Sequence, residues 1–372
     1  MKIAYLEFVR LPTEKAHGLQ MMKTCEALAH AGARVELVVP ARRTKISGDP
    51  FDFYHVRRNF ILTRVKVPDL VRYGALGFLI SLLVFSERAR WHKSFWESDA
   101  VYSRDYLVLL QYVLLGRPLV FEAHAKPNAL SAFVARRASR VIVISRALQE
   151  AYVARGVDAK RIVLAPDAVD IGQFSLGISK EEARAKLGFE NGRYLVAYTG
   201  HLYARKGAQT LARAALLLPD VAFAFVGGTD KDVASFRERW GSAKNIRIEG
   251  YVAPQKVPCY LRAADALVLP NSANDEDSAR FTSPMKLFEY LASGTPVVAS
   301  DVPSVREVLD ESTALFVAPD DPEALAHGVE RVLNDSNAIS RAHTGKRLAE
   351  RYSWAARAHA ILSGLDSSAQ AR

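Results

Sequence analysis

Short apolar runs alternate with amphipathic stretches along almost the whole chain, and this alternation is the feature that most limits the fold. Runs such as Val141-Ile142-Val143-Ile144 have the length and composition of buried strands, whereas the stretches between runs place apolar residues at helical spacing. Strands that alternate with helices form parallel sheets with helices packed on their faces. The sequence therefore predicts an α/β fold.

The 372 residues exceed the size of one ordinary domain, and the expected strands fall into two series. The first series comprises 3–8, 34–39, 100–102, 119–121 and 141–144. The second series comprises 194–199, 222–226, 246–248, 266–269 and 296–299. A turn-rich segment, 166–192, separates the two series. We therefore expect an N-terminal domain over 1–170, a C-terminal domain over 171–350, and a last helix within 351–372 that packs back on the first domain.

The net charge of +10 belongs entirely to the first half of the chain. Residues 1–170 contain 26 Lys and Arg residues and 16 Asp and Glu residues, whereas the remaining 202 residues contain 24 of each kind. A basic half of this type attracts anionic lipid, an acidic glycan or nucleic acid. A surface that merely keeps the protein dissolved is the alternative, and the composition does not separate the two.

An apolar stretch in the first half, 74–85, has Ser81 as its one polar residue, with Arg72 before it and Glu87, Arg88 and Arg90 after it. Its twelve residues are too few to span a bilayer, which takes about 20. We expect a buried or half-buried helix of the first domain, and the alternative is a helix that dips into a membrane surface. The basic residues upstream of the stretch keep that alternative open.

The two cysteines, Cys25 and Cys259, stand far apart and provide neither a disulfide framework nor the spacing of a metal site. The chain starts with a strand-like run at 2–6 and not with the apolar run and small-residue cleavage site of a signal peptide. We therefore expect a cytoplasmic protein, with peripheral contact to the inner face of the membrane if the 74–85 helix touches lipid.

The strongest local signal is a helix start at Ser283. Ser283 is a favourable N-cap residue, and Pro284 suits the first helical position because the N–H that it lacks has no partner there. The free amides at a helix start bind anions, so those of Met285 and Lys286 are candidates for a phosphate. Glu289, about one turn farther on, could accept two hydroxyl groups of a ribose. A well-capped helix with a surface glutamate is the alternative, which helix physics alone favours.

A glycine-bounded loop follows the strand expected at 194–199. It extends from Gly200 to Gly207 and carries Arg205 and Lys206. This composition suits a diphosphate, because a guanidinium group binds two oxygens in a fork and an ammonium group supplies a compact charge. A basic surface turn explains the loop equally well when the loop is considered alone.

Polar residues also follow the expected strands of the first half, at the edge where open α/β sheets bind ligands. They are Arg104, Glu122, His124 and Ser145. His124 is the candidate for catalysis because it stands at a strand end and not on an apolar face. A structural histidine is the alternative.

Several cofactor motifs are missing from the sequence. No Gly-x-Gly-x-x-Gly follows the first strand, which disfavours a dinucleotide cofactor, and there is neither a P-loop nor zinc-ligand spacing. The acidic run Asp275-Glu276-Asp277 could bind a divalent ion, but a solvated loop is the better interpretation. We therefore expect no cofactor and no metal ion.

Taken together, these residues resemble the retaining glycosyltransferases of family 4, also described as glycosyl transferases group 1. The resemblance covers most of the chain and is densest over 195–308, where its longest stretch extends from Ser283 to Ser300. Order and spacing agree, so the similarity is specific for the family, although not for the sugar or the acceptor. It implies the GT-B architecture, in which two Rossmann-like domains face each other across a cleft.

The resemblance also implies a role for each matched residue. Arg205 and Lys206 would hold the donor diphosphate and stabilise it as it leaves, and Glu289 would bind the ribose. His124 would contact the donor sugar near the reacting carbon. The remaining donor contacts would come from Gly18, Gly200, Tyr251, Val252, Ser283, Pro284, Met285 and Lys286. Of these, Gly18 would let its loop approach the diphosphate, and Tyr251 with Val252 would border the base.

The sequence departs from the family pattern at Phe281, where the first glutamate of the Glu-x7-Glu motif would stand. Glu289 matches the second glutamate. A subset of the family with the pattern Ser-Pro-x-Lys-Leu-x-Glu-Tyr is similar to this chain and also lacks the first one. Asp277, Ser278 or Arg280 could orient the donor sugar instead.

The implied reaction moves a hexosyl unit from a UDP- or GDP-sugar to a hydroxyl group of a glycan or a lipid-linked acceptor, with retention at the anomeric carbon. The basic first half favours an anionic or membrane-borne acceptor of polysaccharide or cell-envelope biosynthesis, and we expect no nucleic-acid partner. Two alternatives remain. One is a sugar-nucleotide epimerase of the same architecture, and the other is a non-enzymatic basic protein that binds polyanions.

Overall fold

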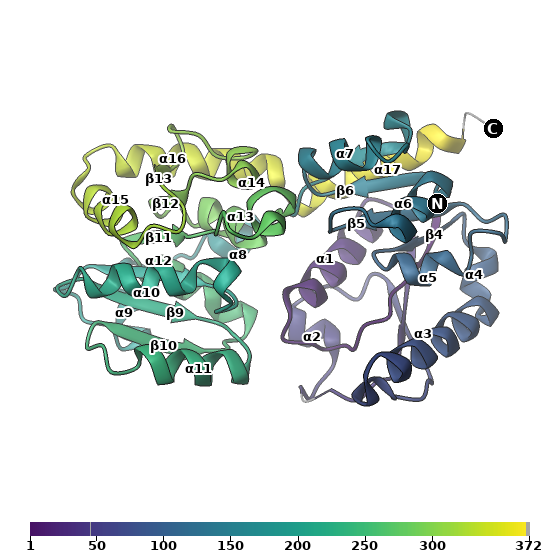
Figure 1. Ribbon diagram of the computed structural model, residues 1–372, viewed down its shortest axis with the longest axis horizontal. Helices are drawn as coiled ribbons and strands as arrows, with labels where there is room; N and C mark the ends of the chain where they lie inside the picture. Colours follow the sequence, from purple (N-terminus) through teal and green to yellow (C-terminus); the bar gives the residue numbers. More distant parts are fainter. Residues whose placement is uncertain (45, 370–372) are drawn as a thin grey trace. The chain divides into compact units, whose positions relative to one another are not determined.

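The computed structural model describes residues 1–44 and 46–369, with side chains through residue 365, and the chain divides into two compact units. The first unit is Met1–Pro166 together with the segment from Trp354 onward, and the second unit is Asp167–Ser353 (Figure 1). The expected boundaries at residues 170 and 350 thus lie four and three residues from the observed ones. The chain leaves the first unit once and later returns to it.

The first unit is built on a parallel sheet of seven strands in the order β3-β2-β1-β4-β5-β6-β7. Its strands are β1 (Lys2–Leu6), β2 (Arg34–Pro40), β3 (Ile61–Val65), β4 (Ala100–Ser103), β5 (Leu119–Ala123), β6 (Arg140–Val143) and β7 (Ile162–Leu164). Its helices are α1 (Ala16–His30), α2 (Pro50–Tyr54), α3 (Gly74–Trp91), α4 (Lys93–Glu97), α5 (Tyr106–Leu110), α6 (Ala129–Arg137), α7 (Arg146–Val153) and α17 (Trp354–Ala369).

The last helix, α17, belongs to the core of the first unit. One face of the seven-stranded sheet packs against α1 and α17, and Ile361 of α17 is fully buried in the same cluster as Tyr5 of β1 and Met22 of α1. Gly364 approaches β7 so closely that a Cβ atom there would lie 2.5 Å from a methyl group of Val163. The returning segment therefore covers part of the sheet that the first 166 residues form.

The second unit is built on a parallel sheet of six strands in the order β10-β9-β8-β11-β12-β13. Its strands are β8 (Leu195–Thr199), β9 (Ala222–Val226), β10 (Ile246–Gly250), β11 (Ala266–Leu269), β12 (Val297–Ser300) and β13 (Leu315–Val317). Its helices are α8 (Ile171–Phe174), α9 (Lys180–Leu187), α10 (Ala208–Leu216), α11 (Asp230–Trp240), α12 (Val257–Ala263), α13 (Met285–Ser293), α14 (Pro303–Arg306), α15 (Pro322–Asn334) and α16 (Ala338–Ala349).

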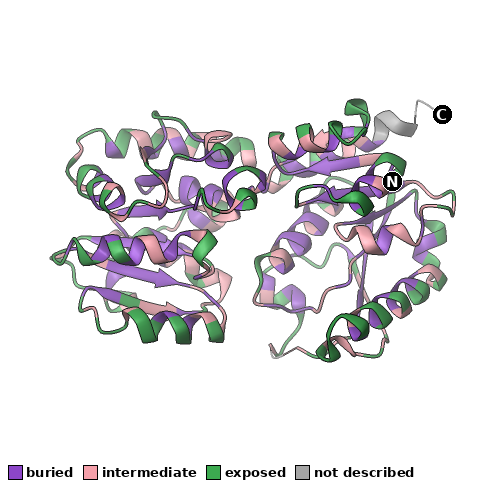
Figure 2. Cartoon of the chain, viewed as in Figure 1, coloured by how far each residue is buried: buried purple, intermediate pink, exposed green. Residues whose placement is uncertain are grey.

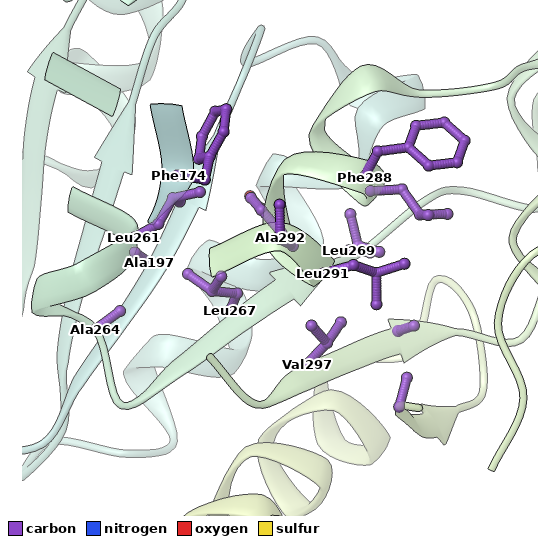
Figure 3. Packing of buried hydrophobic residues seen from close by; sticks show 14 of the residues in the cluster. Phe174, Ala197, Leu261, Ala264, Leu267, Leu269, Phe288, Leu291, Ala292 and Val297 are labelled. Atoms are coloured by element: carbon purple, nitrogen blue, oxygen red, sulfur yellow. The ribbon is translucent and has the colours of Figure 1, made fainter. Parts of the chain in front are cut away.

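Each face of this second sheet has its own hydrophobic cluster, because successive side chains of a strand point to opposite faces. On β8, Leu195 and Ala197 join a cluster with α12 and α13, part of which Figure 3 shows. Val196 and Tyr198 join the cluster that contains α10, α11 and α15. Strands covered on both faces are apolar throughout, and they appear buried in Figure 2.

The expected fold class, two Rossmann-like α/β domains, is confirmed. All ten expected strands are present within a few residues, and the sequence missed three, which are β3, β7 and β13. Each of these three lies at the edge of its sheet. An edge strand pairs on one side alone and is partly exposed, as the burial of β3 shows, so its apolar pattern is weak.

Candidate functional site

The loop after β8 is held tightly against the carboxyl ends of its neighbouring strands. The amide of Gly200 donates to the carbonyl of Val226 at the end of β9 (2.8 Å). A Cβ atom on Gly207 would lie 1.5 Å from the carbonyl oxygen of Pro270, just beyond β11, and Gly207 also has a φ of +75° that favours glycine. The glycines that bound the loop therefore bring its backbone close to the edge of the sheet.

Arg205 and Lys206 lie on a single helical turn within this loop, Ala204–Lys206. The hydroxyl group of Ser278 donates to the carbonyl of Arg205 (2.8 Å), which ties the loop to the segment that precedes α13. Arg205 is exposed, whereas Lys206 is half-buried. Loss of hydration lowers the pKa of Lys206, the charge of Arg205 lowers it further, and Asp275 and Asp167 act in the opposite direction.

The start of α13 differs from the expected one. The helix begins at Met285, Pro284 occupies the N-cap position, and no side chain caps the helix. Ser283 accepts a hydrogen bond from the backbone amide of Asp167 (3.1 Å), so its expected capping role is wrong. The hydroxyl group joins α13 to the segment at which the second unit begins. The amides of the first turn consequently have no capping side chain, which suits an anion site.

The two faces of α13 have different surroundings. Leu287, Phe288, Leu291 and Ala292 are buried in the cluster on one face of the sheet, where Figure 3 shows Leu291 and Ala292 near Leu267 of β11 and Val297 of β12. Lys286 and Glu289 are three residues apart and stand off this buried face. Packing of the apolar face thus fixes the direction in which the charged pair projects.

Lys286 is the least satisfied charged group of this region. Its ammonium nitrogen lies 4.0 Å from the centre of the Tyr198 ring, is buried, and has no hydrogen-bond partner among the described residues. Loss of hydration sets the pKa of Lys286 well below its usual value, the charge of Lys206 lowers it further, and Glu289 opposes the shift. A buried amine beside a second amine is a favourable place for an anionic ligand.

Glu289 is the acidic partner in this group. Loss of hydration raises the pKa of its carboxyl group to about 7, and the charge of Lys286 limits the rise. The next residue, Tyr290, accepts a hydrogen bond from the amide of Thr199 (2.7 Å), which fixes α13 to the end of β8. The group that can accept ribose hydroxyls is therefore held rigidly beside the glycine-rich loop.

The second unit thus brings most of the expected donor residues together at one edge of its sheet. An atom added at Gly200 would contact the side chain of Lys286 (3.9 Å), and Lys206 lies close enough to affect the pKa of Lys286. Tyr251 and Val252 follow β10, where Tyr251 is exposed and Val252 packs against the core cluster. Contact of these two residues with a base remains a prediction.

Phe281 and its neighbours take up a turn of π-helix, Asp277–Phe281. Phe281 is buried, so an apolar side chain occupies the position of the missing glutamate. Ser278 is also buried and bonded to the loop carbonyl, whereas Asp277 and Arg280 are exposed. Among the three residues that could replace the glutamate, Asp277 and Arg280 have side chains with access to solvent.

The candidate residue of the first unit is His124, which follows β5. Its Nε2 atom lies 2.6 Å from a carboxylate oxygen of Glu122, and Glu122 is completely buried. The same carboxylate accepts hydrogen bonds from Gln20 (2.8 Å), from Arg357 (2.6 Å) and from Tyr102. Glu122 therefore holds one nitrogen of the His124 ring within a dense buried network.

The charge of Glu122 is balanced by its partners. Burial alone would raise the pKa of its carboxyl group, but the charges of Arg357, His124 and Arg104 hold that pKa well below the usual value. Arg104, which follows β4, reaches Glu122 through Gln20, whose side-chain oxygen accepts from Arg104 (2.8 Å). Three of the four polar residues expected at this edge are thus connected. The fourth, Ser145, caps α7 instead.

Gly18 has a packing role in the structure. A Cβ atom at this position would lie 2.3 Å from the hydroxyl oxygen of Tyr54 and 2.6 Å from a methyl group of Thr13. Tyr54 in turn donates to the carbonyl of Thr13 (2.9 Å) and accepts from its amide (2.7 Å). The approach of this loop to a diphosphate remains a prediction, since packing alone already requires glycine.

Sequence reasoning missed three of the partners of Glu122. Gln20 lies on α1, Tyr102 on β4 and Arg357 on α17, so chain separation hides them. One signal was present, because Glu122 directly follows the apolar run Leu119-Val120-Phe121, and a buried carboxylate requires partners. Among the described residues, no group of three or more His, Cys, Asp or Glu side chains could hold a metal ion.

Two family models match the chain. The model described as Glycosyl transferases group 1 matches residues 193–335, and the model described as Glycosyltransferase Family 4 matches residues 19–173. Each match lies almost entirely within one of the two units. Together the two matches cover most of the chain.

Curated relatives match over shorter stretches. D-inositol 3-phosphate glycosyltransferase of Corynebacterium urealyticum is 28% identical over 233 residues, which are 58% of this chain and 53% of that protein. The putative teichuronic acid biosynthesis glycosyltransferase TuaH of Bacillus subtilis is 28% identical over 162 residues, which are 43% of this chain and 40% of that protein. The chain therefore spans about half the length of the curated relatives that it matches.

Solved structures match over the whole chain. Sucrose-phosphate synthase of Thermosynechococcus elongatus superposes with a TM-score of 0.80 at 20% identity and covers 100% of both chains. Anabaena Alr3699/HepE in complex with UDP-glucose superposes with a TM-score of 0.77 at 20% identity and covers 99% of this chain and 100% of that one. At these identities the likeness concerns the fold, which is that of GT-B glycosyltransferases. The fold and the two family matches together establish that the chain belongs to the family 4 glycosyltransferases, group 1.

Proposed function

We propose that the protein is a retaining glycosyltransferase that moves a hexosyl unit from a nucleotide-diphosphate sugar to an acceptor hydroxyl group. One observation carries the proposal: the buried amine of Lys286 and the half-buried Lys206 lie close enough to interact, beside an uncapped helix start. Two amines whose pKa values are depressed in the free protein are well placed to bind an anion with two negative charges. A nucleoside diphosphate is such an anion.

In the proposed complex, each part of the donor meets a group of matching chemistry. The diphosphate lies between Arg205, Lys206 and the first amides of α13, those of Met285 and Lys286, while Glu289 accepts the ribose hydroxyls. Negative charge develops on the phosphate as the glycosidic bond breaks, and fixed positive charges stabilise it without reorganising. This arrangement needs no metal ion. Full activity in EDTA is the expected result, and complete loss of activity would instead favour the acidic loop at 275–277 as a site for a divalent ion.

His124 is proposed to contact the transferred sugar near its reacting carbon. Its bond to Glu122 supports this proposal, since a carboxylate on one ring nitrogen fixes the orientation of the ring. Retention of the anomeric configuration comes from the family resemblance. It predicts an α-linked product from an α-linked donor, which NMR of the product would verify.

The donor is the part of the proposal that is simplest to test. A structural neighbour, Anabaena HepE, has been solved with UDP-glucose, and this favours a UDP-sugar over a GDP-sugar. In a thermal-shift panel of UDP-, GDP- and ADP-sugars, we expect the UDP-sugars to raise the melting temperature most, because a ligand stabilises the state that binds it. The Lys286→Ala variant serves as the matched control and should lose most of the shift. A flat response to every nucleotide sugar would contradict the proposal.

The acceptor is proposed to be a glycan or lipid-linked sugar of polysaccharide or cell-envelope biosynthesis, reached from the cytoplasmic side. The Bacillus relative named for teichuronic acid biosynthesis and the basic first unit favour an anionic acceptor. Incubation with the donor alone distinguishes transfer from epimerisation. NMR should show an unchanged sugar configuration, and a new epimer would point to the second enzyme class. Polyanion binding without any nucleotide-sugar affinity would instead identify a non-enzymatic binder.

A further inference from the structure

The outer face of α3 carries a stripe of large aliphatic side chains. Leu76, Leu79, Ile80 and Leu83 are exposed by 70%, 47%, 40% and 46% of their surface. Their spacing of three, four and seven residues places them on one side of the helix. Figure 2 colours much of this helix as exposed. An exposed apolar stripe of this kind costs solubility and adds nothing to the folded core.

The opposite face of α3 is firmly attached to the first unit, so the stripe is displayed on a rigid support. Ser81, Leu82 and Phe85 are buried, and the Phe85 ring lies 5.6 Å from that of Phe8, just beyond β1. The hydroxyl group of Ser81 donates to the carbonyl of Pro68 (2.8 Å), which anchors the preceding segment. The apolar stripe is thus separate from the surface that α3 uses for folding.

Exposed aromatic side chains stand at both ends of the stripe. Tyr73 is 63% exposed and precedes the helix, while Trp91 is 75% exposed and ends it. Each lies beneath a guanidinium group, that of Arg72 at 4.7 Å from the Tyr73 ring centre and that of Arg90 at 5.3 Å from the Trp91 ring centre. Amphipathic rings beside basic groups suit the boundary between lipid headgroups and acyl chains.

The charge around the stripe is predominantly positive. The segment 64–93 contains six Lys and Arg residues and two acidic residues. The two acids, Asp69 and Glu87, are both paired, with Arg42 at 3.0 Å and Arg90 at 2.5 Å respectively. Lys66 and Lys93 are exposed to solvent. An apolar face with a basic margin is complementary to an anionic lipid surface, whereas two copies of this face would repel each other.

We propose that this stripe, Leu76, Leu79, Ile80 and Leu83, docks the first unit on an anionic bilayer, with Tyr73 and Trp91 at the headgroup level. The helix lies on the membrane and does not cross it, since no helix among the described residues is both long and apolar enough to span a bilayer. The docking proposal rests on the proposed function in one respect, because the purpose of docking is to bring the enzyme to a lipid-linked acceptor. Docking itself requires neither donor nor acceptor.

Vesicle flotation tests the surface directly. The full chain should float with vesicles of phosphatidylcholine that contain about 30% phosphatidylglycerol and remain unbound with phosphatidylcholine alone. The Leu76→Ser/Leu79→Ser variant should lower the apparent partition coefficient at least about tenfold, because two apolar side chains no longer leave water. Lys66→Gln/Lys93→Gln should weaken binding and reduce its sensitivity to salt. Trp91 emission should shift to the blue on binding in the wild type.

The second unit offers matched controls. Leu216 and Leu217 are 51% and 52% exposed, and Lys231 and Lys244 are exposed as well. The Leu216→Ser/Leu217→Ser and Lys231→Gln/Lys244→Gln variants should float like the wild type. Equal losses in the controls, or no flotation with either vesicle, would overturn the proposal. A dimer that disappears in the Leu76→Ser/Leu79→Ser variant would show that a second copy covers the stripe instead.

Failure of docking and failure of the proposed reaction are separable. Flotation uses vesicles without donor or acceptor, and the thermal-shift panel uses nucleotide sugars without vesicles. A chain that binds UDP-sugars and does not float would refute the docking surface alone. A chain that floats and binds no nucleotide sugar would refute the proposed function and leave the surface intact.

Discussion

Lys286 and Lys206 place two amines at the edge of the second sheet, where loss of hydration disfavours the charged form of each amine as long as no anion is bound. Their folded pKa values are lower than those of an unfolded chain, so the unfolded protein holds more protons at pH values between the folded pKa values and the ordinary lysine pKa. Stability of the free protein should therefore rise as the pH increases toward the usual lysine range. A bound diphosphate would reduce this penalty, because an anion stabilises the charged form of both groups.

Replacement of Lys206 tests this balance between stability and activity. In Lys206→Ala we expect turnover to fall about a hundredfold, since one fixed contact to a developing charge contributes about 3 kcal/mol. The melting temperature without ligand should be equal to or higher than that of the wild type, because a poorly hydrated amine is removed. Steady-state kinetics and thermal unfolding measure the two effects. Turnover near the wild-type value would remove Lys206 from the proposed site.

Glu289 predicts a pH dependence of the opposite sign. The pKa of its carboxyl group is about 7 in the folded protein and ordinary in the unfolded one, so the folded state holds the extra proton between these values. The stabilisation is complete below the ordinary pKa and is lost as the pH rises through about 7. The limit of the effect is about 3 kcal/mol.

In the Glu289→Gln variant this dependence should vanish. We expect its melting temperature to match the wild type near pH 5 and to exceed it by several degrees near pH 8. Thermal unfolding at a series of pH values measures the difference. An offset that stays the same at every pH would show that the carboxyl group of Glu289 does not titrate in this range. Nucleotide affinity should fall in the same variant, since the ribose loses an ionised acceptor.

For single residues, the sequence predicted which residues belong to the candidate site better than it predicted which residues they contact. Arg205, Lys206, Lys286 and Glu289 were recognised from short local patterns, and the structure places them at one edge of one sheet. The burial of Lys286 was not predicted, because it depends on Tyr198, which is distant in the chain. Hydration and charge–charge interactions depend on the packing of several elements, so residue order alone does not reveal them.

Among the elements, α17 has a part that its sequence does not reveal. It supplies Arg357, whose side chain is 2% exposed and reaches the fully buried carboxylate of Glu122 on β5. Arg357 also donates to the carbonyl of Pro166 (2.7 Å), the last residue before the chain enters the second unit. One side chain therefore joins the returning helix both to the middle of the sheet and to the point where the chain leaves it.

A double-mutant cycle measures this buried pair. Arg357→Met leaves the carboxylate of Glu122 without its main counter-charge and should destabilise the first unit by about 3–5 kcal/mol. The Glu122→Gln/Arg357→Met double variant should lose less than the sum of the two single losses, because neither unpaired charge remains. Urea unfolding gives the free energies. Strictly additive losses would show that the pair is not coupled.

The helix α3 shows what the apolar pattern leaves undetermined. A helix was expected over 74–85 and the structure extends it to Trp91. Because the stretch is apolar all round, its sequence could not indicate which side faces the sheet. The structure selects the side through Phe8 and Pro68, which lie outside the helix. The edge strands β3, β7 and β13 were not predicted for a related reason. One edge of each strand has no neighbouring strand, so the strand is less covered and its apolar pattern is weaker.

At the scale of the whole molecule, the second unit is continuous in sequence and the first is interrupted. We expect the fragment 167–353 to fold alone and to unfold cooperatively, since both faces of its sheet are covered by its own helices. It should also retain UDP binding, which calorimetry would measure. A fragment without a cooperative transition would contradict this independence.

The first unit supplies the matched comparison. Residues 1–166 alone lack α17 and should be unstable, whereas residues 1–166 joined to 354–369 by a short Gly-Ser linker should fold. The linker is feasible because Arg357 bonds to the carbonyl of Pro166, so the two ends already lie near each other. Circular dichroism during thermal unfolding distinguishes the two chains. Equal cooperativity in both would show that α17 is dispensable.

The return of the chain to its first unit has a consequence for synthesis on the ribosome. The sheet of the first unit emerges early, yet the helix that covers α1 and neutralises Glu122 is translated after all of the second unit. The apolar surface that α17 covers in the folded unit stays exposed to solvent during that interval, and the second unit completes its own core first. Translation speed over 167–353 therefore sets how long the nascent first unit is exposed to chaperones and proteases.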